Sequence, residues 1–247
     1  MTGASKGIGR AINEEFLRLG ASTIIVSRHE EDLLKLEEEY RAKKWHCKVY
    51  AADLSDETDL TALINYLRME WDQLDILVNN VGFNLRKPTL EYTIEDLRKV
   101  MQLNVETAFV LSLKLHPLLV KSGRASVVNI SSITSQTVVP TSTPVYHMSK
   151  GAMDQMNDFL AVEWGKEKIR VNAIHPWYIN TPMASQVLRD DKKRRQIEKL
   201  TPLGRIGEPI EVARVSAFLA MDASSYVSGA NIRVDGGFAK AGMPLDE

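Results

Sequence analysis

Tyr146 and Lys150 are the residues of this sequence whose types and spacing most directly indicate acid–base chemistry. A free tyrosine has a pKa of about 10, which is too high for efficient proton transfer near neutrality. A neighbouring ammonium group favours the phenolate and therefore lowers that pKa. Residues four positions apart lie on the same face of a helix, so a helix here would place both side chains together. The pair is a candidate proton-transfer site, with Tyr146 as the acid.

A glycine-rich segment, residues 2–9, has the composition of a phosphate-binding loop. Glycines let a backbone approach a pyrophosphate closely, and the helix that follows would offer free N–H groups and a partial positive charge. On its own, the same pattern is also typical of a plain turn before a helix. The residues predicted to contact a dinucleotide are Gly3, Ser5, Lys6, Gly7, Ile8 and Gly9.

The elements that must position these residues alternate along the chain. Near-continuous apolar strands separated by amphipathic helices indicate a parallel sheet that is covered on both faces. The sequence predicts an α/β protein with a doubly wound, mostly parallel sheet, in one domain over 1–247. The predicted strands are 22–26, 48–54, 74–80, 125–131, 169–174 and 231–237. The predicted helices are 30–44, 57–71, 93–120, 145–166 and 208–221, after a first helix that follows the glycines.

The start of the sequence is unusual for such a sheet. A glycine-rich phosphate loop normally follows the first strand, but here it begins at Thr2. We therefore expect the first, central strand to be absent. One explanation is a natural chain with about ten more N-terminal residues, enough for a short strand and its lead.

The composition argues against several classes of protein. The 31 Lys and Arg residues nearly balance the 32 Asp and Glu residues, which gives no electrostatic reason to expect nucleic acid or a membrane surface. The single cysteine, Cys47, excludes an internal disulfide, and no histidine–carboxylate pair has metal-ligand spacing, so we expect no metal. Without a membrane-length apolar run or a signal-peptide pattern, we expect a cytoplasmic protein, although a longer start would leave room for a targeting peptide.

Three motifs in the right order resemble those of the short-chain dehydrogenase/reductase family. They are the glycine-rich segment 2–9, NNVG at 79–82, and YHMSK at 146–150. The resemblance continues to VSGANIRVDGG at 227–237 and covers essentially the whole chain except the missing strand. The segments 79–93, 150–165 and 175–183 are similar to tropinone reductases and their plant homologues.

That resemblance implies a Rossmann-type fold and a small-molecule carbonyl substrate. The implied reaction is the reversible NADPH-dependent reduction of a small ketone to an alcohol, with a hydride from the nicotinamide and a proton from Tyr146. A runner-up is a catalytically silent relative that binds a dinucleotide or a partner and is disabled by the missing strand.

Cofactor preference follows from the charge at the end of the strand 22–26. An acidic residue there would hold a ribose 2′-hydroxyl, whereas a basic residue suits a 2′-phosphate. Ser27 and Arg28 stand at this position, with no carboxylate before Glu30, so we predict NADP(H). Further cofactor contacts implied by the resemblance are Asp53, Leu54, Asn80, Gly82, Ile179 and Thr181. Asp53, Asn80 and Thr181 also suit turn or helix-capping roles.

The resemblance implies a catalytic set of four residues, Asn104, Ser132, Tyr146 and Lys150. Ser132 would polarise the carbonyl oxygen, and Lys150 would also hydrogen-bond the nicotinamide ribose. The spacing from Ser132 to Tyr146 is one residue longer than usual, which leaves Ser131, and then Ser135, as alternatives. Asn104 would fix a helix bend and hold a water that relays protons to Lys150.

The substrate is expected beside this set, under a polar flap at 183–200 that would close and exclude water. The candidate substrate contacts are Val139, His175, Trp177, Tyr178 and Met183, each of which also suits simple packing. His147 is adjacent to Tyr146 but need not face the site, because neighbouring residues of a helix point in different directions, so we expect no catalytic role for it.

A homodimer or homotetramer is implied through the helices 93–120 and 145–166. Four apolar residues of the second helix suit either that contact or the core of one subunit. They are Met153, Met156, Phe159 and Leu160.

Overall fold

Residues 1–241, which the computed structural model describes, contain six parallel β-strands. They are β1 (Thr23–Ser27), β2 (Cys47–Ala51), β3 (Ile76–Asn79), β4 (Ser126–Ile130), β5 (Arg170–Pro176) and β6 (Asn231–Val234). The strands β1 and β4 are almost completely buried, as expected when helices cover both faces of a sheet. β1 pairs with β2, while β3, β4, β5 and β6 pair in that order. Every predicted strand is present with slightly different ends.

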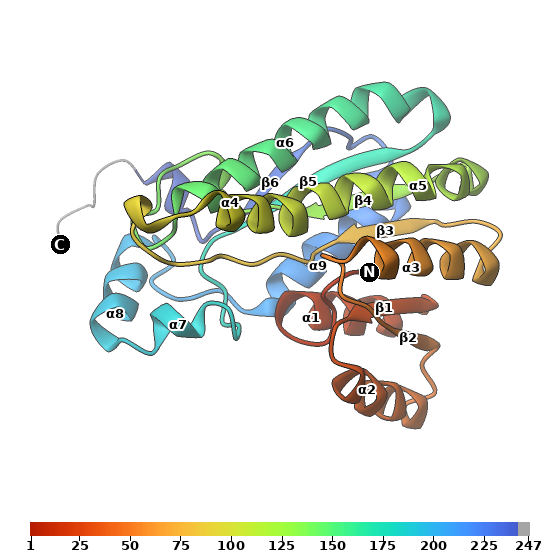
Figure 1. The fold of residues 1–247 in the computed structure, drawn as a ribbon, viewed down its shortest axis with the longest axis horizontal. Helices are drawn as coiled ribbons and strands as arrows, with labels where there is room; N and C mark the ends of the chain where they lie inside the picture. The colour runs from red at the N-terminus through yellow and green to blue at the C-terminus, as the bar shows by residue number, and fades with distance from the viewer. Residues whose placement is uncertain (242–247) are drawn as a thin grey trace.

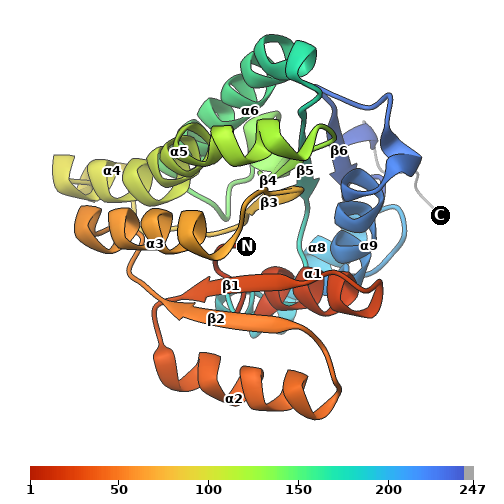
Figure 2. The same ribbon diagram turned by 90° about the vertical axis from the view of Figure 1, so that its right-hand side faces the viewer.

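The first three residues lie between β1 and β3 (Figures 1 and 2). The amide of Gly3 donates to the carbonyl of Val26 at 2.8 Å, and the amide of Thr2 donates to the carbonyl of Val78 at 3.2 Å. Thr2 forms a parallel bridge with Val26. This short segment joins the two strand groups into one layer, and the described chain contains no full strand at that position, as predicted.

Helices cover both faces of this layer (Figure 2). On one face lie α3 (Glu57–Glu70), α5 (Thr107–Ser122) and α6 (Pro144–Trp164). On the other face lie α1 (Gly7–Arg18), α2 (Glu30–Ala42) and α9 (Pro209–Ala220). Separate apolar cores form on the two faces, so the sheet is doubly wound and the described chain is a single domain. Residues 242–247, which the sequence assigned to the same domain, lie outside the described residues.

The predicted helix 93–120 is interrupted. It consists of α4 (Ile94–Met101) and α5, which are joined by a π-helical turn at Gln102–Glu106. The combined stretch, Ile94–Ser122, is long and apolar enough to cross a membrane by length and composition, so the prediction that no such run exists was wrong. Its residues Leu111, Leu115 and Leu119 are buried in the core, and the core helix of a soluble protein passes the same test.

The predicted flap contains two helices, α7 (Ser185–Leu188) and α8 (Asp191–Leu200). The carboxylate of Asp190 caps α8 by accepting hydrogen bonds from the amides of Lys192 and Lys193. Val187 and Ile197 are buried beside Tyr178. The flap is thereby anchored next to the carboxyl ends of the strands, and its closing motion remains a prediction.

Candidate active site

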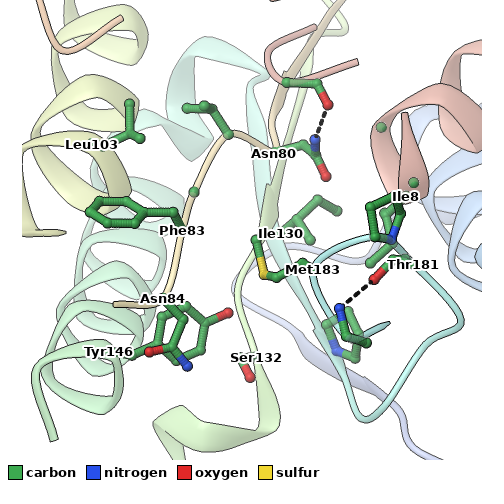
Figure 3. A pocket seen from close by; sticks show the side chains of 18 of the residues that line it. Ile8, Asn80, Phe83, Asn84, Leu103, Ile130, Ser132, Tyr146, Thr181 and Met183 are labelled. Carbon is green, nitrogen blue, oxygen red and sulfur yellow. Dashed lines mark hydrogen bonds between the residues drawn. The ribbon is translucent and has the colours of Figure 1, made fainter. Parts of the chain in front are cut away.

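A cavity of about 430 Å³ opens at the carboxyl ends of the strands, where ligands of doubly wound sheets bind. It runs from the glycine-rich segment past the ends of β3 and β4 to the flap (Figure 3). The predicted cofactor residues that line it are Gly3, Ser5, Lys6, Gly7, Ile8, Gly9, Ser27, Arg28, Leu54, Asn80, Gly82, Ile179 and Thr181. The predicted catalytic and substrate residues that line it are Ser132, Tyr146, Lys150, Val139, Trp177, Tyr178 and Met183. Asp53, Asn104 and His175 are not on its surface.

The glycine-rich segment is held in place by close backbone approaches. A Cβ at Gly9 would lie 2.4 Å from the carbonyl oxygen of Gly3, so only glycine fits there without displacement. The side chain of Asn80 donates hydrogen bonds to the carbonyls of Thr2 and Gly3, at 3.0 and 2.9 Å. Asn80 therefore has the structural role that the sequence left open, and it also lines the cavity.

The end of β1 carries the predicted positive charge. Ser27 shares a hydrogen bond of 2.9 Å with Ser5 of the glycine-rich segment, and Arg28 lines the cavity beside them. Among the described residues, no aspartate or glutamate lines this cavity. This charge distribution is complementary to a phosphorylated ligand.

Asp53 does not line the cavity, and its contact with the cofactor stays a prediction. Its carboxylate accepts hydrogen bonds from the hydroxyl and the amide of Ser55, at 2.7 and 3.0 Å, and these bonds lower its pKa. The sequence had left this turn role open. The neighbouring Leu54 and Ser55 face the cavity instead.

Tyr146 is positioned at one end of the cavity by the first turn of α6, close to Ser132 (Figure 3). Burial raises the pKa of Tyr146 to about 12, and the hydroxyl of Ser132 and the charge of Arg86 only partly offset this effect. The sequence predicted that Lys150 lowers this pKa, but the net shift is upward and its causes are burial, Ser132 and Arg86. Tyr146 is therefore a neutral phenol near neutrality, which is the form that a proton donor requires.

Of the three candidate serines, Ser132 is the one that interacts with Tyr146. The hydroxyl of Ser131 donates instead to the carboxylate of Asp154 at 2.7 Å. That of Ser135 donates to the carbonyl of Ser132, also at 2.7 Å. The geometry thus favours Ser132, and the two alternatives have structural partners.

Lys150 lies beneath Tyr146, 5.7 Å from the centre of its ring. Its ammonium donates a hydrogen bond of 2.8 Å to the carbonyl of Ile130 at the end of β4. Burial lowers the pKa of Lys150 to about 8, although the carboxylate of Asp154 counteracts this shift. The lysine is therefore close to its titration range at neutral pH.

His175 is completely buried and does not line the cavity, so the prediction that it contacts substrate was wrong. Its Nε2 lies 3.0 Å from the Oδ1 atom of Asp154, the atom that also accepts from Ser131. His175 thus belongs to a buried polar group behind Lys150. The other histidine considered, His147, follows Tyr146 in the sequence. Its Nε2 accepts a hydrogen bond of 3.1 Å from the amide of Val139, and it thereby supports the loop that borders the cavity.

Asn104 lies in the π-helical turn between α4 and α5 and is completely buried. Its side-chain oxygen accepts from the amide of Phe83 at 2.9 Å, and its amide group donates to the carbonyl of Phe83 and to the hydroxyl of Ser149. A Cβ added at Gly82 would lie 3.1 Å from Asn104 Oδ1 and 3.7 Å from Lys150 Nζ. Asn104 and Lys150 therefore face one another across Gly82.

The flap end of the cavity combines aromatic and polar groups. The Trp177 ring stacks on Phe238 at 3.6 Å between ring centres, and the Tyr178 hydroxyl lies 2.5 Å from that of Thr141. Ile179 forms a bridge with Gly207, while Thr181 accepts from the amide of Ala184 in a capping arrangement.

Several cavity residues were missed in the sequence. Asn84 donates to the hydroxyl of Ser142 at 2.9 Å and accepts from that of Thr143 at 2.9 Å. Phe83 and Arg86 follow the same strand end and also line the cavity. The signal that was overlooked is their position directly after β3, where the loop must pass the open edge of the sheet.

Comparison with known proteins finds relatives over nearly the whole chain. The family model described as "Enoyl-(Acyl carrier protein) reductase", a short-chain dehydrogenase model, matches residues 3–239. A tropinone reductase homolog from Arabidopsis thaliana is 41% identical over 244 residues, which cover 98% of this chain and 90% of the relative. Senescence-associated protein 13 from the same plant is 41% identical over 238 residues, covering 96% of this chain and 88% of the relative.

Solved structures show the same fold. A putative gluconate dehydrogenase from Agrobacterium tumefaciens superposes with a TM-score of 0.92 at 31% identity, covering 96% of this chain and 93% of its own. RhlG from Pseudomonas aeruginosa, solved as an NADP complex, has a TM-score of 0.90 at 34% identity, with 96% and 94% covered. A gluconate 5-dehydrogenase from Burkholderia cenocepacia, solved with NADP and tartrate, has a TM-score of 0.91 at 28% identity, with 97% and 94% covered. The chain therefore belongs to the short-chain dehydrogenase/reductase family of oxidoreductases.

Proposed function

We propose that this protein reduces a small ketone to an alcohol with NADPH as the hydride donor. The observation that carries the proposal is one continuous cavity. It joins the glycine-rich segment and Arg28 at one end to Tyr146 and Ser132 at the other. A dinucleotide and a small carbonyl compound would meet within it.

The residues present suit NADPH. The close approach of Gly9 to Gly3 packs the glycine-rich segment tightly against the start of α1, where N–H groups favour phosphate. Arg28 and Lys6 would face the 2′-phosphate with no lining carboxylate to oppose it. Bound NADPH would supply the hydride to the carbonyl carbon.

The protein's own residues would supply the proton and the electrostatic support. Neutral Tyr146 would donate its proton to the carbonyl oxygen as the carbon accepts the hydride, and Ser132 would donate a hydrogen bond to the same oxygen. The Lys150 ammonium would stabilise the resulting phenolate. Asn104 would position this set by holding the backbone of Phe83. The net reaction converts ketone, NADPH and one proton to alcohol and NADP⁺.

The first test is binding followed by turnover. NADPH and NADH would be titrated against the purified chain by nicotinamide fluorescence, and a ketone panel would then be assayed by NADPH oxidation. NADPH-selective binding with turnover supports the proposal. Selective binding without turnover of any ketone would favour the silent-relative alternative.

We also propose that the subunits associate through α5 and α6. Met153 and Leu160 are buried within the subunit, whereas Phe159 is 67% exposed and Val162 is 86% exposed. Phe109 and Leu113 of α5 are also exposed, and exposed apolar side chains in neighbouring helices are typical of an interface. Light scattering should therefore give a dimer or tetramer, and a monomer would contradict this proposal.

A further inference from the structure

Positively charged side chains line the cavity along its whole length, and not only at the end where the dinucleotide phosphates would bind. Among residues 1–241, its lining includes five cationic side chains and no aspartate or glutamate. They are Lys6, Arg28, Arg86, Lys99 and Lys150. Lys6 and Arg28 stand at the glycine-rich end, Lys99 lies close enough to Asp53 to lower its pKa, and Lys150 lies beneath Tyr146. Arg86 is the cation that this distribution leaves unexplained.

Arg86 lies at the substrate end of the cavity. Its Nε donates to the carbonyl of Thr141 at 3.3 Å, and its Nη1 donates to the side-chain oxygen of Gln186 at 2.9 Å. Gln186 belongs to α7 in the flap, and Thr141 belongs to the loop that leads into α6. The charge of Arg86 also lowers the pKa of Tyr146, which places the guanidinium within electrostatic reach of the proton donor.

Both acceptors of Arg86 are neutral. No carboxylate of the described chain forms an ion pair with it, and its Nη2 has no hydrogen-bond acceptor there. The adjacent Lys87 differs, because it pairs with Asp96 and lies over the ring of Tyr92. The two neighbouring cations thus have different surroundings, and of the two only Arg86 lines the cavity and keeps a donor group without a partner in the described chain.

We propose that Arg86 binds an anionic group of the substrate, so that the substrate class is an oxo acid. This inference rests on the proposed carbonyl reduction. The free Nη2 group and the second Nη1 hydrogen present a planar donor edge, which suits a carboxylate. Two neutral hydrogen bonds already fix the guanidinium, so little side-chain freedom is lost on binding. Arg86 acts here as a substrate-binding residue that orients the carbonyl toward Tyr146.

The direct test compares acids with their neutral esters. NADPH oxidation by the full chain would be measured with pyruvate, acetoacetate and levulinate, each against its methyl ester. We expect at least one acid to exceed its ester in kcat/KM by about tenfold to one hundredfold, the range for a charged hydrogen bond. Arg86→Gln should abolish this preference, so that the ratio of kcat/KM for each acid to that for its own ester falls to about one. Arg124→Gln, the same change at an exposed site, should leave the preference intact.

A second measurement needs no variant. Valerate should inhibit reduction of a neutral ester competitively in the wild-type protein, at least about tenfold more strongly than valeramide. Ester turnover with no preference for any acid, and equal inhibition by both compounds, would overturn the inference while leaving the proposed function intact. Absence of turnover of every compound, in a chain that binds NADPH, would instead overturn the proposed function.

Discussion

The ammonium of Lys150 lies 5.7 Å from the centre of the Tyr146 ring, and burial shifts the pKa values of the two residues in opposite directions. Burial disfavours the charged form of each group, so the phenol keeps its proton more firmly and the ammonium loses its proton more readily. The site is therefore set for proton donation by Tyr146, with Lys150 as the titrating partner.

Replacing Tyr146 by phenylalanine should remove the proton donor and keep the aromatic ring. We expect kcat/KM for ketone reduction to fall by about one hundredfold to ten-thousandfold, the usual range for a general acid. NADPH affinity by fluorescence titration should stay within about twofold. Tyr226→Phe, at a fully exposed tyrosine, is the matched control and should behave as wild type. Equal activity of the two variants would remove Tyr146 from the mechanism.

The pH dependence of reduction should report Lys150. Its folded pKa of about 8 lies below its ordinary value of 10.5, so the ammonium is lost above about pH 8 while Tyr146 stays protonated. We expect kcat/KM to be level below that pH and to fall by up to about tenfold per unit above it. A profile that remains level to high pH would contradict this assignment.

The same shift has a consequence for stability. Between the folded and unfolded pKa values of Lys150, the unfolded chain holds a proton that the folded chain has released. The contribution of Lys150 to the free energy of unfolding should therefore rise with pH across that window. Denaturant titrations of wild type and Lys150→Met at several pH values would isolate this contribution. A difference in the free energy of unfolding between the two proteins that stays constant with pH would contradict the prediction.

Replacing Asp154 by asparagine should weaken the buried group behind Lys150. Asp154 accepts from Ser131, lies 3.0 Å from His175 Nε2, and raises the pKa of Lys150. We expect a loss of about 1–3 kcal/mol in the free energy of unfolding and a shift of the alkaline limb of kcat/KM to lower pH. Asp72→Asn, at an exposed aspartate, is the control. An unchanged pH profile would show that Asp154 acts on stability alone.

Arg28 should determine the choice of cofactor. Arg28→Ala should weaken NADPH binding by about tenfold to one hundredfold, as expected for loss of charged hydrogen bonds, and leave NADH binding nearly unchanged. Fluorescence titration with both dinucleotides measures this selectivity. A parallel loss of both affinities would indicate damage to the loop and would refute a specific role for Arg28.

Adding one methyl group to Gly9 should disturb the phosphate loop. A Cβ there would lie 2.4 Å from Gly3 O and 2.5 Å from Asn80 Nδ2, so the loop must move. We expect Gly9→Ala to cost about 1–3 kcal/mol in stability and to weaken NADPH binding. Gly165→Ala, where nothing lies within 4 Å of the added Cβ, should be neutral or slightly stabilising. Equal stability of both variants would contradict this packing argument.

Much of the fold follows from local sequence signals. The strands were predictable because helices on both faces require continuous apolar runs such as that of β4. The π-helical turn at Asn104 was not, because its extra residue is stabilised by bonds to Phe83 and Ser149, which are distant in sequence. The predicted bend at Asn104 came from the family resemblance rather than from helical periodicity.

The site residues that belong to sequence motifs were predictable, whereas roles and pKa values that depend on burial were not. His175 resembles a ligand contact by its position at a strand end, yet its ring points into the interior toward Asp154. The expected effect of Lys150 on Tyr146 failed for a similar reason, since a sequence gives spacing but not desolvation. Arg86 was overlooked because only the folded flap and the loop around Thr141 reveal its surroundings.

The segment Met1–Gly3 hydrogen-bonds to β1 on one side and to β3 on the other, and the glycine-rich loop continues directly from it. The two strand groups are thus connected by backbone that continues directly into the loop that would hold a pyrophosphate. A dinucleotide bound to this loop would therefore stabilise the connection between the two strand groups of the sheet. Tighter binding of the dinucleotide would then raise the free energy of unfolding, so that the melting temperature of the protein would report the occupancy of this loop.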